Sequence, residues 1–252
     1  MKLSTLIALP LAVLIVAGAV MLDQALAFEA QSAQASAAAE QAESDNGWVV
    51  LFDGTSTEHW RGFKKDGFPD RGWEVVDGTL HKIARAGGGD IITRASYDSF
   101  EFVWEWKVAE GANSGVMYHV AEADDLRATY MSGPEYQILE DANHRDGGNP
   151  KTSSGALYAL IACNQDKQLS PVGEWNTSKI IVNGDHVEHW LNGKMVVEYV
   201  LGSDELNELI ANSKFKNWPH FAKKGEGHIA LQDHGDDVWF RNIRIREIDA
   251  DE

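Results

Sequence analysis

The sequence predicts an all-β sandwich or jelly roll, and three observations support this fold class. Segments rich in β-branched and aromatic residues recur along the chain, two Asn-Gly dipeptides mark tight turns, and one segment alone has a convincing helical pattern. The region outside the N-terminal segment, about 200 residues, suits one domain of this kind and can bury a substantial core.

Turn chemistry and residue type place the strands. Asn183-Gly184 and Asn192-Gly193 favour the positive φ angles of hairpin turns, so residues 179–200 should form a three-stranded meander. The other segments that we expect to be extended are 48–52, 79–83, 100–108, 115–120, 133–141, 156–161, 227–233 and 238–248.

One short helix is predicted after residue 203. Ser203 is a suitable N-cap, and Asp204 and Glu205 complement the positive end of the helix dipole. Apolar residues at 206, 209 and 210 form one stripe that can pack against the sandwich.

The N-terminal region predicts export. Lys2 precedes an apolar run over residues 6–22, and Ala25-Leu26-Ala27 is a small-residue cleavage site, so residues 1–27 read as a signal peptide. An uncleaved membrane anchor is the alternative, because the run could nearly span a bilayer. A periplasmic or secreted location follows from cleavage after Ala27.

Composition divides the rest of the chain. Residues 28–46 are rich in Ala, Gln, Ser and Glu and predict a low-complexity tether. Residues 47–248 form the single β-sandwich domain, and residues 249–252 are an acidic tail.

Charge and cysteine content limit the partners. A formal net charge of −17 argues against nucleic acid and anionic membranes, and no stable membrane insertion is expected after signal cleavage. Cys163 is the only cysteine, so the domain has no internal disulfide and must be stable through packing. Nine tryptophans supply core residues and also rings that can stack on sugars.

The stretch 133–141 carries the clearest functional signal. Side chains alternate along a strand, so Glu135 and Gln137 share one face of a predicted sheet. Burying that polar face without partners would be costly. The pair therefore predicts a sheet surface that holds a polar ligand, and a sugar is the natural candidate.

Glu140 adds a second carboxylate to this strand. Glu135 and Glu140 would face opposite sides of a regular strand, and a β-bulge between them would bring them together. Laminarinase-type β-glucanases use a similar E-x-D-x-x-E motif, whose chemistry requires carboxyl groups about 5 Å apart. Gln137 replaces the middle Asp and argues against that activity. A solvated strand with harmless acids is the plainer alternative.

Other polar residues near predicted strand ends could contact a sugar. Asn113 precedes the strand that carries Tyr118, and both are substrate-binding candidates, although an ordinary turn explains Asn113 as well. Trp175 and Asn176 place a ring beside an amide, which suits sugar stacking or a plug at the end of the sandwich.

The histidines and acids leave several roles open. His234 follows Gln232 at a turn and could act as acid or base near neutral pH, and His144 in a glycine-rich loop has the same ambiguity. The acids around residues 141–146 and 233–237 have no recognisable ligand spacing. No cofactor is therefore assigned, and a divalent metal ion such as calcium is an open alternative.

The order and spacing of several short motifs are specific as a set. They are Leu51-Phe52-Asp53-Gly54, Asp77-Gly78-Thr79-Leu80, Asn113-Ser114-Gly115, Glu135-Tyr136-Gln137-Ile138-Leu139, Gly155-Ala156-Leu157-Tyr158, Gly173-Glu174-Trp175-Asn176, Leu191-Asn192-Gly193, Leu231-Gln232-Asp233-His234-Gly235 and Phe240-Arg241-Asn242-Ile243. Over residues 47–248 the chain resembles the 3-keto-disaccharide hydrolase domain family.

This resemblance implies a concanavalin A-like jelly-roll β-sandwich of two antiparallel sheets with one short helix, and a ligand site on the concave sheet. It also implies action on glycosides oxidised to a ketone at C3. The cleft residues that it implies are Asn113, Glu135, Gln137, Trp175, Asn176, Gln232 and His234. Glu140, Ala159 and Cys163 depart from the family pattern, which bears on substrate range more than on fold.

The chemistry of such a substrate suggests roles. A ketone at C3 acidifies the C2 proton, so a base can form an enediolate that expels the C1 substituent, and water can then add. We expect Glu135 and His234 to be the acid and base, in either order, and Asn113, Gln137 and Gln232 to donate hydrogen bonds. The alternatives are a lectin-like binding module, a β-glucanase-type hydrolase and a tethered scaffold domain.

Overall fold

A computed structural model describes residues 47–249. The predicted signal peptide (1–27) and tether (28–46) lie outside the described residues, as do the last three residues of the predicted acidic tail. The elements are β1 (Trp48–Phe52), β2 (Trp60–Gly62), β3 (Trp73–Val76), β4 (Thr79–Lys82), β5 (Ile91–Thr93), β6 (Phe100–Val108), β7 (Asn113–Val120), η1 (Thr129–Met131), β8 (Glu135–Leu139), η2 (Arg145–Gly148), β9 (Asn176–Asn183), β10 (His186–Leu191), β11 (Lys194–Val200), α2 (Asp204–Ala211), η3 (Lys214–Asn217), β12 (His228–Leu231) and β13 (Val238–Glu247).

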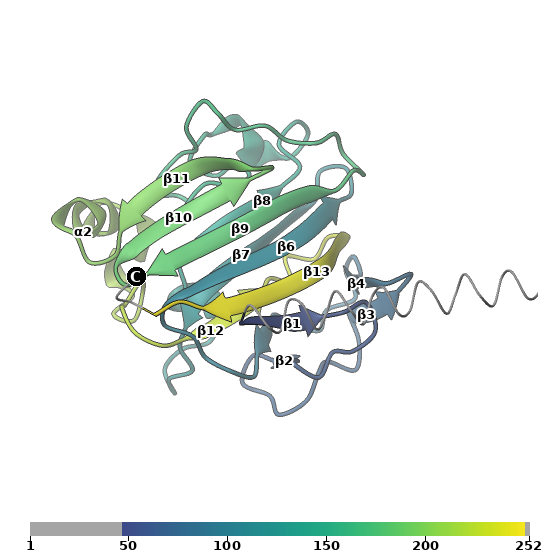
Figure 1. The fold of residues 1–252 in the computed structure, drawn as a ribbon. Coiled ribbons are helices and arrows are strands. Elements are labelled where there is room, and N and C mark those ends of the chain that lie inside the picture. The colour runs from purple at the N-terminus through teal and green to yellow at the C-terminus, as the bar shows by residue number, and fades with distance from the viewer. Residues whose placement is uncertain (1–46, 250–252) are drawn as a thin grey trace, which may run out of the picture. The chain divides into compact units, whose positions relative to one another are not determined.

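The strands form two antiparallel sheets that pack face to face (Figure 1). The eight-stranded sheet has the order β11-β10-β9-β6-β13-β4-β3, with β1 also paired to β13, and the five-stranded sheet has the order β2-β5-β12-β7-β8. The predicted sandwich of two antiparallel sheets with one short helix is confirmed.

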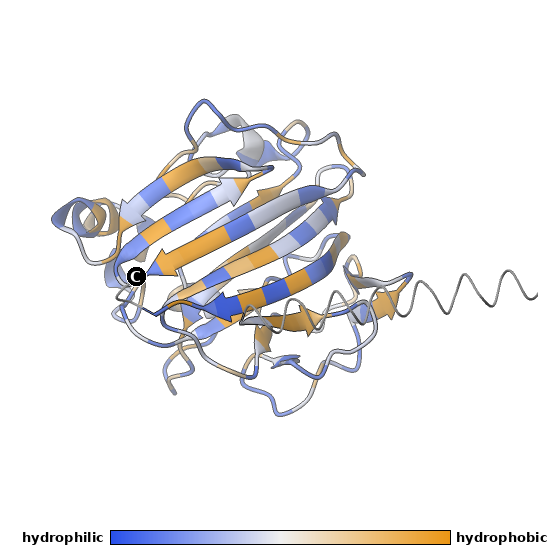
Figure 2. Cartoon of the chain, in the orientation of Figure 1, coloured by the Kyte–Doolittle hydropathy of each residue, from blue (hydrophilic) through white to orange (hydrophobic). Residues whose placement is uncertain are grey.

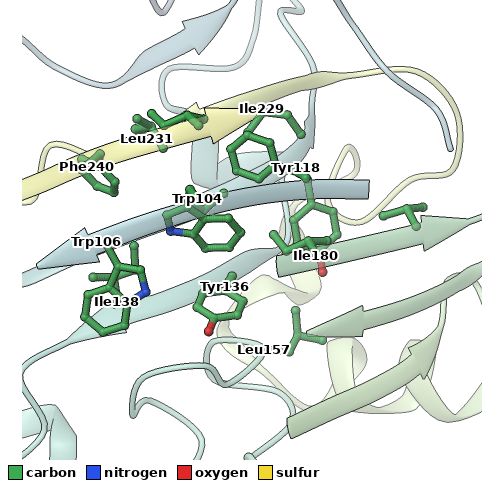
Figure 3. Packing of buried hydrophobic residues seen from close by; sticks show 14 of the residues in the cluster. Trp104, Trp106, Tyr118, Tyr136, Ile138, Leu157, Ile180, Ile229, Leu231 and Phe240 are labelled. Carbon is green, nitrogen blue, oxygen red and sulfur yellow. The ribbon is translucent and has the colours of Figure 1, made fainter. Parts of the chain in front are cut away.

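Alternation of side chains explains why each sheet has one buried face. In β10, Val187, His189 and Leu191 are buried while the residues between them are partly exposed, and the same alternation of polar and apolar residues is visible along the large sheet in Figure 2. Aromatic residues fill the space between the sheets (Figure 3). Trp104 of β6 meets Tyr136 of β8 edge to face, with ring centroids 5.0 Å apart.

The core also contains a cluster of three polar side chains, from Tyr118, His189 and Tyr199, that links the two sheets. The hydroxyl of Tyr118 lies 2.9 Å from His189 Nε2 and forms a short hydrogen bond with the hydroxyl of Tyr199. His189 Nδ1 lies 3.0 Å from the carbonyl oxygen of Gly155, which can only accept, so Nδ1 carries the proton and Nε2 accepts. Burial lowers the pKa of His189 to about 4, so the ring is neutral.

Several local predictions are confirmed. The meander forms as β9, β10 and β11. Helix α2 begins after Ser203, whose hydroxyl accepts a hydrogen bond from the Leu206 amide at 3.2 Å. No helix within residues 47–249 is long and apolar enough to span a membrane.

One predicted strand is wrong. Residues 156–161 form a turn with isolated bridges from Leu157 to Tyr136 and to Ile161, rather than a strand. Ala159 has a φ of 61°, which turns the chain and ends any extended pairing. The short strands β2, β3 and β5 were not predicted.

Candidate active site

The candidate site lies on the face of the five-stranded sheet that points away from the core. Gly115 of β7 pairs with Gln137 of β8, and on its other side the Gln232 amide donates to the Gly115 carbonyl oxygen at 3.0 Å. Tyr136 and Ile138 point into the core, so Gln137 and Glu135 point outward. The two glutamines thus flank a glycine on one surface.

Glu135 occupies the space above that glycine. It pairs with Met117, and a Cβ atom built on Gly115 would lie 2.2 Å from Glu135 Oε1. Any larger residue at 115 would displace the carboxyl group. The missing side chain of Gly115 therefore lets the carboxyl group lie across β7.

These residues line a pocket of about 330 Å³. Five of the predicted site residues lie there together: Asn113, Glu135, Gln137, Gln232 and His234. An aromatic wall faces them. It is formed by Tyr130, Tyr158, Phe215, Trp218 and Phe221, and Lys214 and Gly133 complete the lining. A polar floor beside an aromatic wall suits a ring that has hydroxyl groups and apolar faces.

The three floor amides have a fixed orientation. Gln137 Nε2 donates to the Thr152 carbonyl oxygen at 3.1 Å, and the Gln232 side chain bonds to the Glu135 carboxyl group. The side-chain oxygens of Asn113, Gln137 and Gln232 are buried and have no hydrogen-bond partner among residues 47–249. The atom of each amide that lacks a partner is therefore an acceptor oxygen, and the expected role of these residues as donors to a sugar stays a prediction.

Burial makes Glu135 an unusual carboxyl group. Its side chain is at the floor of the pocket and the residue is 8% exposed. Desolvation is the largest effect and raises its pKa from 4.5 to about 8. The charge of Lys214 is the next largest effect and opposes this increase, Asp90 raises the pKa further, and the Gln232 side chain lowers it. Glu135 is therefore mainly protonated near neutral pH and can give a proton to a bound group.

His234 lies at the rim of the same pocket, with its side chain 47% exposed. Asn113 Nδ2 lies 3.4 Å from His234 Nε2, and an amide nitrogen can only donate, so Nε2 holds the lone pair. On the other side of the ring, Asp236 Oδ2 lies 4.0 Å from Nδ1 and accepts the Asn113 backbone amide at 3.0 Å. This arrangement leaves Nε2 as the His234 atom that can accept a proton, with the Asp236 carboxylate near Nδ1.

A buried ion pair anchors the loop that carries His234. Lys82 is fully buried, and its Nζ lies 2.9 Å from Asp233 Oδ1. The Gly89 amide donates to Asp233 Oδ2 at 2.9 Å, and the Asp233 amide donates to Asp90 at 2.8 Å. These bonds hold the residue directly before His234 from three directions.

The structure places four predicted binding residues elsewhere. Tyr118 is in the core beside His189, because its position in β7 alternates with that of Gly115. His144 caps the 3-10 helix η2, where its Nδ1 accepts from the Asp146 amide at 3.1 Å. Neither side chain lines the pocket.

Asn176 begins β9 of the eight-stranded sheet, and Trp175 directly precedes it. The Trp175 ring packs against the Arg241 guanidinium at 4.0 Å and lies 5.1 Å from Lys107 Nζ. Asn176 is buried, and its Oδ1 accepts from the Ser170 amide at 2.9 Å and from Asn192 Nδ2 at 2.8 Å. Both therefore have structural contacts away from the polar floor.

Glu140 does not pair with Glu135. No bulge interrupts the pairing of β7 with β8, and Glu140 lies just past the end of β8. Its carboxylate accepts the amides of Gly111, Ala142 and Asn143, each at 3.0 Å. Burial raises the pKa of Glu140, but these hydrogen bonds outweigh it and lower the pKa overall. The two-carboxylate site of the β-glucanase alternative is not assembled.

No group of three or more His, Cys, Asp or Glu side chains within residues 47–249 is arranged to hold a metal ion.

The aromatic wall was the part of the site that the sequence did not reveal. Its signal is the spacing of Phe215, Trp218 and Phe221 directly after α2, which presents three rings at intervals of three residues.

Comparison with known proteins identifies the family. A family model for the 3-keto-alpha-glucoside-1,2-lyase-like domain matches residues 47–246. The chain belongs to this family. A 3-keto-disaccharide hydrolase from Bacteroides thetaiotaomicron is 37% identical over 232 residues, which cover 81% of this chain and 79% of that protein. The resemblance drawn from the sequence motifs is confirmed, and the chain is an enzyme of the glycoside hydrolase or lyase class.

Two crystal structures share the fold of this 3-keto-alpha-glucoside-1,2-lyase-like domain. Both are of candidate glycosyl hydrolases from Parabacteroides distasonis. One is 32% identical with a TM-score of 0.76, over 82% of this chain and 96% of that chain. The other is 31% identical with a TM-score of 0.61, over 80% of this chain and 99% of that chain.

Proposed function

We propose that this enzyme cleaves 3-keto-glycosides by elimination of the C1 substituent followed by addition of water. One observation carries the proposal: the buried carboxyl group of Glu135, whose pKa burial raises to about 8, and the imidazole of His234 line the same pocket. The name of the Bacteroides relative and the family description support a 3-keto sugar as substrate. The predicted signal peptide adds the proposal that the enzyme acts outside the cytoplasm.

In the proposed reaction, the bound sugar replaces the 3.4 Å contact of Asn113 Nδ2 with His234 Nε2, and Nε2 then removes the C2 proton of the sugar. The electrons of the C2–H bond form a C2–C3 double bond, and the ketone oxygen becomes an enolate. The Asp236 carboxylate stabilises the imidazolium that His234 becomes.

The leaving group departs in the second half of the reaction. The enolate re-forms the C3 ketone, a C1–C2 double bond forms, and the C1–O bond breaks with its electrons on the leaving oxygen. Glu135 donates its proton to that oxygen. Water then adds across the C1–C2 double bond, so that the net result is hydrolysis.

Solvent deuterium distinguishes elimination from direct hydrolysis. We expect a 3-keto-glucoside cleaved in heavy water to give a 3-keto sugar with one deuterium at C2, measured by mass spectrometry and NMR at early times. The free product incubated with heat-inactivated enzyme controls for spontaneous exchange. Product that retains hydrogen at C2 would exclude the elimination route.

The leaving group tests the acid role of Glu135. We expect Glu135→Gln to lower kcat about 100-fold or more for a 3-keto-glucoside with an alkyl alcohol leaving group. A nitrophenolate leaves without being protonated. The loss of kcat in Glu135→Gln should therefore be much smaller for the nitrophenyl 3-keto-glucoside than for the alkyl one. Equal losses with both substrates would remove Glu135 from the acid role.

A further inference from the structure

Lys214 is a cation in the pocket that the proposed acid and base do not use. It begins η3 and is the one Lys or Arg among the residues that line this pocket. Its Nζ lies 4.2 Å from the centroid of the Tyr158 ring and 5.2 Å from that of Phe215. Among residues 47–249, no carboxylate lies within 4.0 Å of it.

The turn that carries Lys214 is firmly packed. The Ser213 hydroxyl accepts the Phe215 amide at 3.0 Å. Phe215 is 3% exposed and stacks on Phe221 with ring centroids 4.1 Å apart. Tyr158, under the ammonium group, donates its own amide to the Glu135 carbonyl oxygen at 3.0 Å. Lys214 is therefore held over the same strand that presents Glu135.

Among residues 47–249, the Lys214 ammonium group forms no ion pair within 4.0 Å, and Lys214 is an exposed residue in the free enzyme. Burial lowers its pKa, and the negative charges of Glu135 and Asp146 oppose that effect. When Glu135 is protonated, its part of this compensation is lost. A bound ligand would take water away from the ammonium group, and an oxyanion on that ligand would then pair with it.

The proposed reaction creates such an oxyanion at one atom. Removal of the C2 proton places negative charge on the oxygen at C3. The unpaired floor atoms of Asn113, Gln137 and Gln232 are acceptor oxygens, which repel that charge. In the proposed reaction Glu135 donates its proton to the leaving oxygen at C1, so it does not stabilise the oxygen at C3. A cation is also a far stronger partner for an oxyanion than the neutral hydroxyls of the wall tyrosines.

We propose that Lys214 is a catalytic residue that donates a hydrogen bond to the C3 oxygen and stabilises the enolate. This role rests on the proposed function. The ammonium group bonds to the ketone oxygen in the bound substrate, and that bond strengthens as the C2–H electrons move onto this oxygen. Lys214 keeps its proton throughout, and the proton from C2 stays on His234.

Proton exchange isolates this step from cleavage. The probe is a 3-keto sugar that carries hydrogen in place of the C1 substituent, so that it can enolise but not eliminate. In heavy water, the enzyme should exchange the C2 proton of this probe, as measured by NMR. Exchange requires the base and the enolate partner but no acid for a leaving group.

The variants should separate by role. We expect Lys214→Met to slow exchange about 100-fold or more, and Lys214→Arg to recover part of the rate. Glu135→Gln should retain exchange. Lys216→Met, in the same turn but outside the pocket, is the matched control and should exchange like the wild type. Thermal unfolding confirms that each variant is folded.

Two outcomes overturn the proposal in distinguishable ways. Wild-type exchange by Lys214→Met in an enzyme that cleaves 3-keto-glycosides would remove Lys214 alone from the mechanism. A wild-type protein that neither exchanges the probe nor cleaves a 3-keto-glycoside would reject the proposed function, and the role of Lys214 with it.

Discussion

Glu135 links the stability of the protein to its chemistry. Glu135 is 8% exposed, so its carboxyl group is costly to ionise. The resulting pKa of about 8 keeps this carboxyl group mainly protonated at neutral pH, so that it can act as an acid in the pocket. The same shift must appear in the unfolding equilibrium. In the unfolded chain Glu135 ionises near its ordinary pKa of 4.5. Between these two values the folded protein binds a proton that the unfolded chain has lost.

Glu135→Gln should remove this dependence on pH. In the wild type, the contribution of Glu135 to the free energy of unfolding is fully present below pH 4.5 and is lost as pH rises to about 8. The variant should therefore gain stability relative to the wild type by up to about 1.4 kcal/mol per pH unit in that window. Urea unfolding at several pH values measures the difference.

The control for this experiment is Glu58→Gln, at a side chain that is 75% exposed. It should leave the pH dependence of unfolding as in the wild type. Curves for Glu135→Gln that run parallel to the wild type from pH 5 to 8 would show that Glu135 ionises normally in the folded protein.

At the scale of elements, the strand β7 makes room for the acid. Gly115→Ala keeps an extended backbone but puts a Cβ atom 2.2 Å from the present position of Glu135 Oε1. We expect the displaced carboxyl group to lower kcat about 100-fold while the protein still folds. Steady-state kinetics with thermal unfolding measures both effects. Gly67→Ala, where no atom lies within 4 Å, is the control and should retain kcat.

Elements that depend on local chemistry could be predicted from the sequence. The meander β9–β11 follows from its two Asn-Gly turns, and α2 from the cap at Ser203. The strands β2 and β5 have three residues each and exist through pairing with distant partners, which no local pattern records. Residues 156–161 have strand composition, but the positive φ at Ala159 overrides it.

The same limit applies to the candidate site. Glu135 and Gln137 could be predicted from the sequence because they are two apart on one strand. Gln232 was predicted only through the family resemblance, and the residues around Asn113 also fitted an ordinary turn. Trp175 was assigned to the cleft from its residue type, whereas the topology puts it on the other sheet. The wall brings together Tyr130, Tyr158 and the turn after α2, which are remote in sequence.

At the scale of the whole molecule, a second buried group responds to pH in the opposite direction. His189 joins the sheets through Tyr118 of β7 and Tyr199 of β11. Burial lowers its pKa from 6.5 to about 4, so the unfolded chain binds a proton there first as pH falls. The contribution of His189 is present above pH 6.5 and is lost as pH falls to about 4.

The effects of Glu135 and His189 should therefore oppose each other between pH 4.5 and 6.5, each with a slope of about 1.4 kcal/mol per pH unit. In His189→Gln, the part of the free energy of unfolding that the wild type loses as pH falls should be absent. In Glu135→Gln, the part that the wild type loses as pH rises should be absent. Urea unfolding from pH 4 to 8 measures both. His220→Gln, at a side chain 38% exposed, should follow the wild type. If His189→Gln retained the wild-type slope, then folding would not lower the pKa of His189, and the prediction of a burial-shifted core histidine would be wrong.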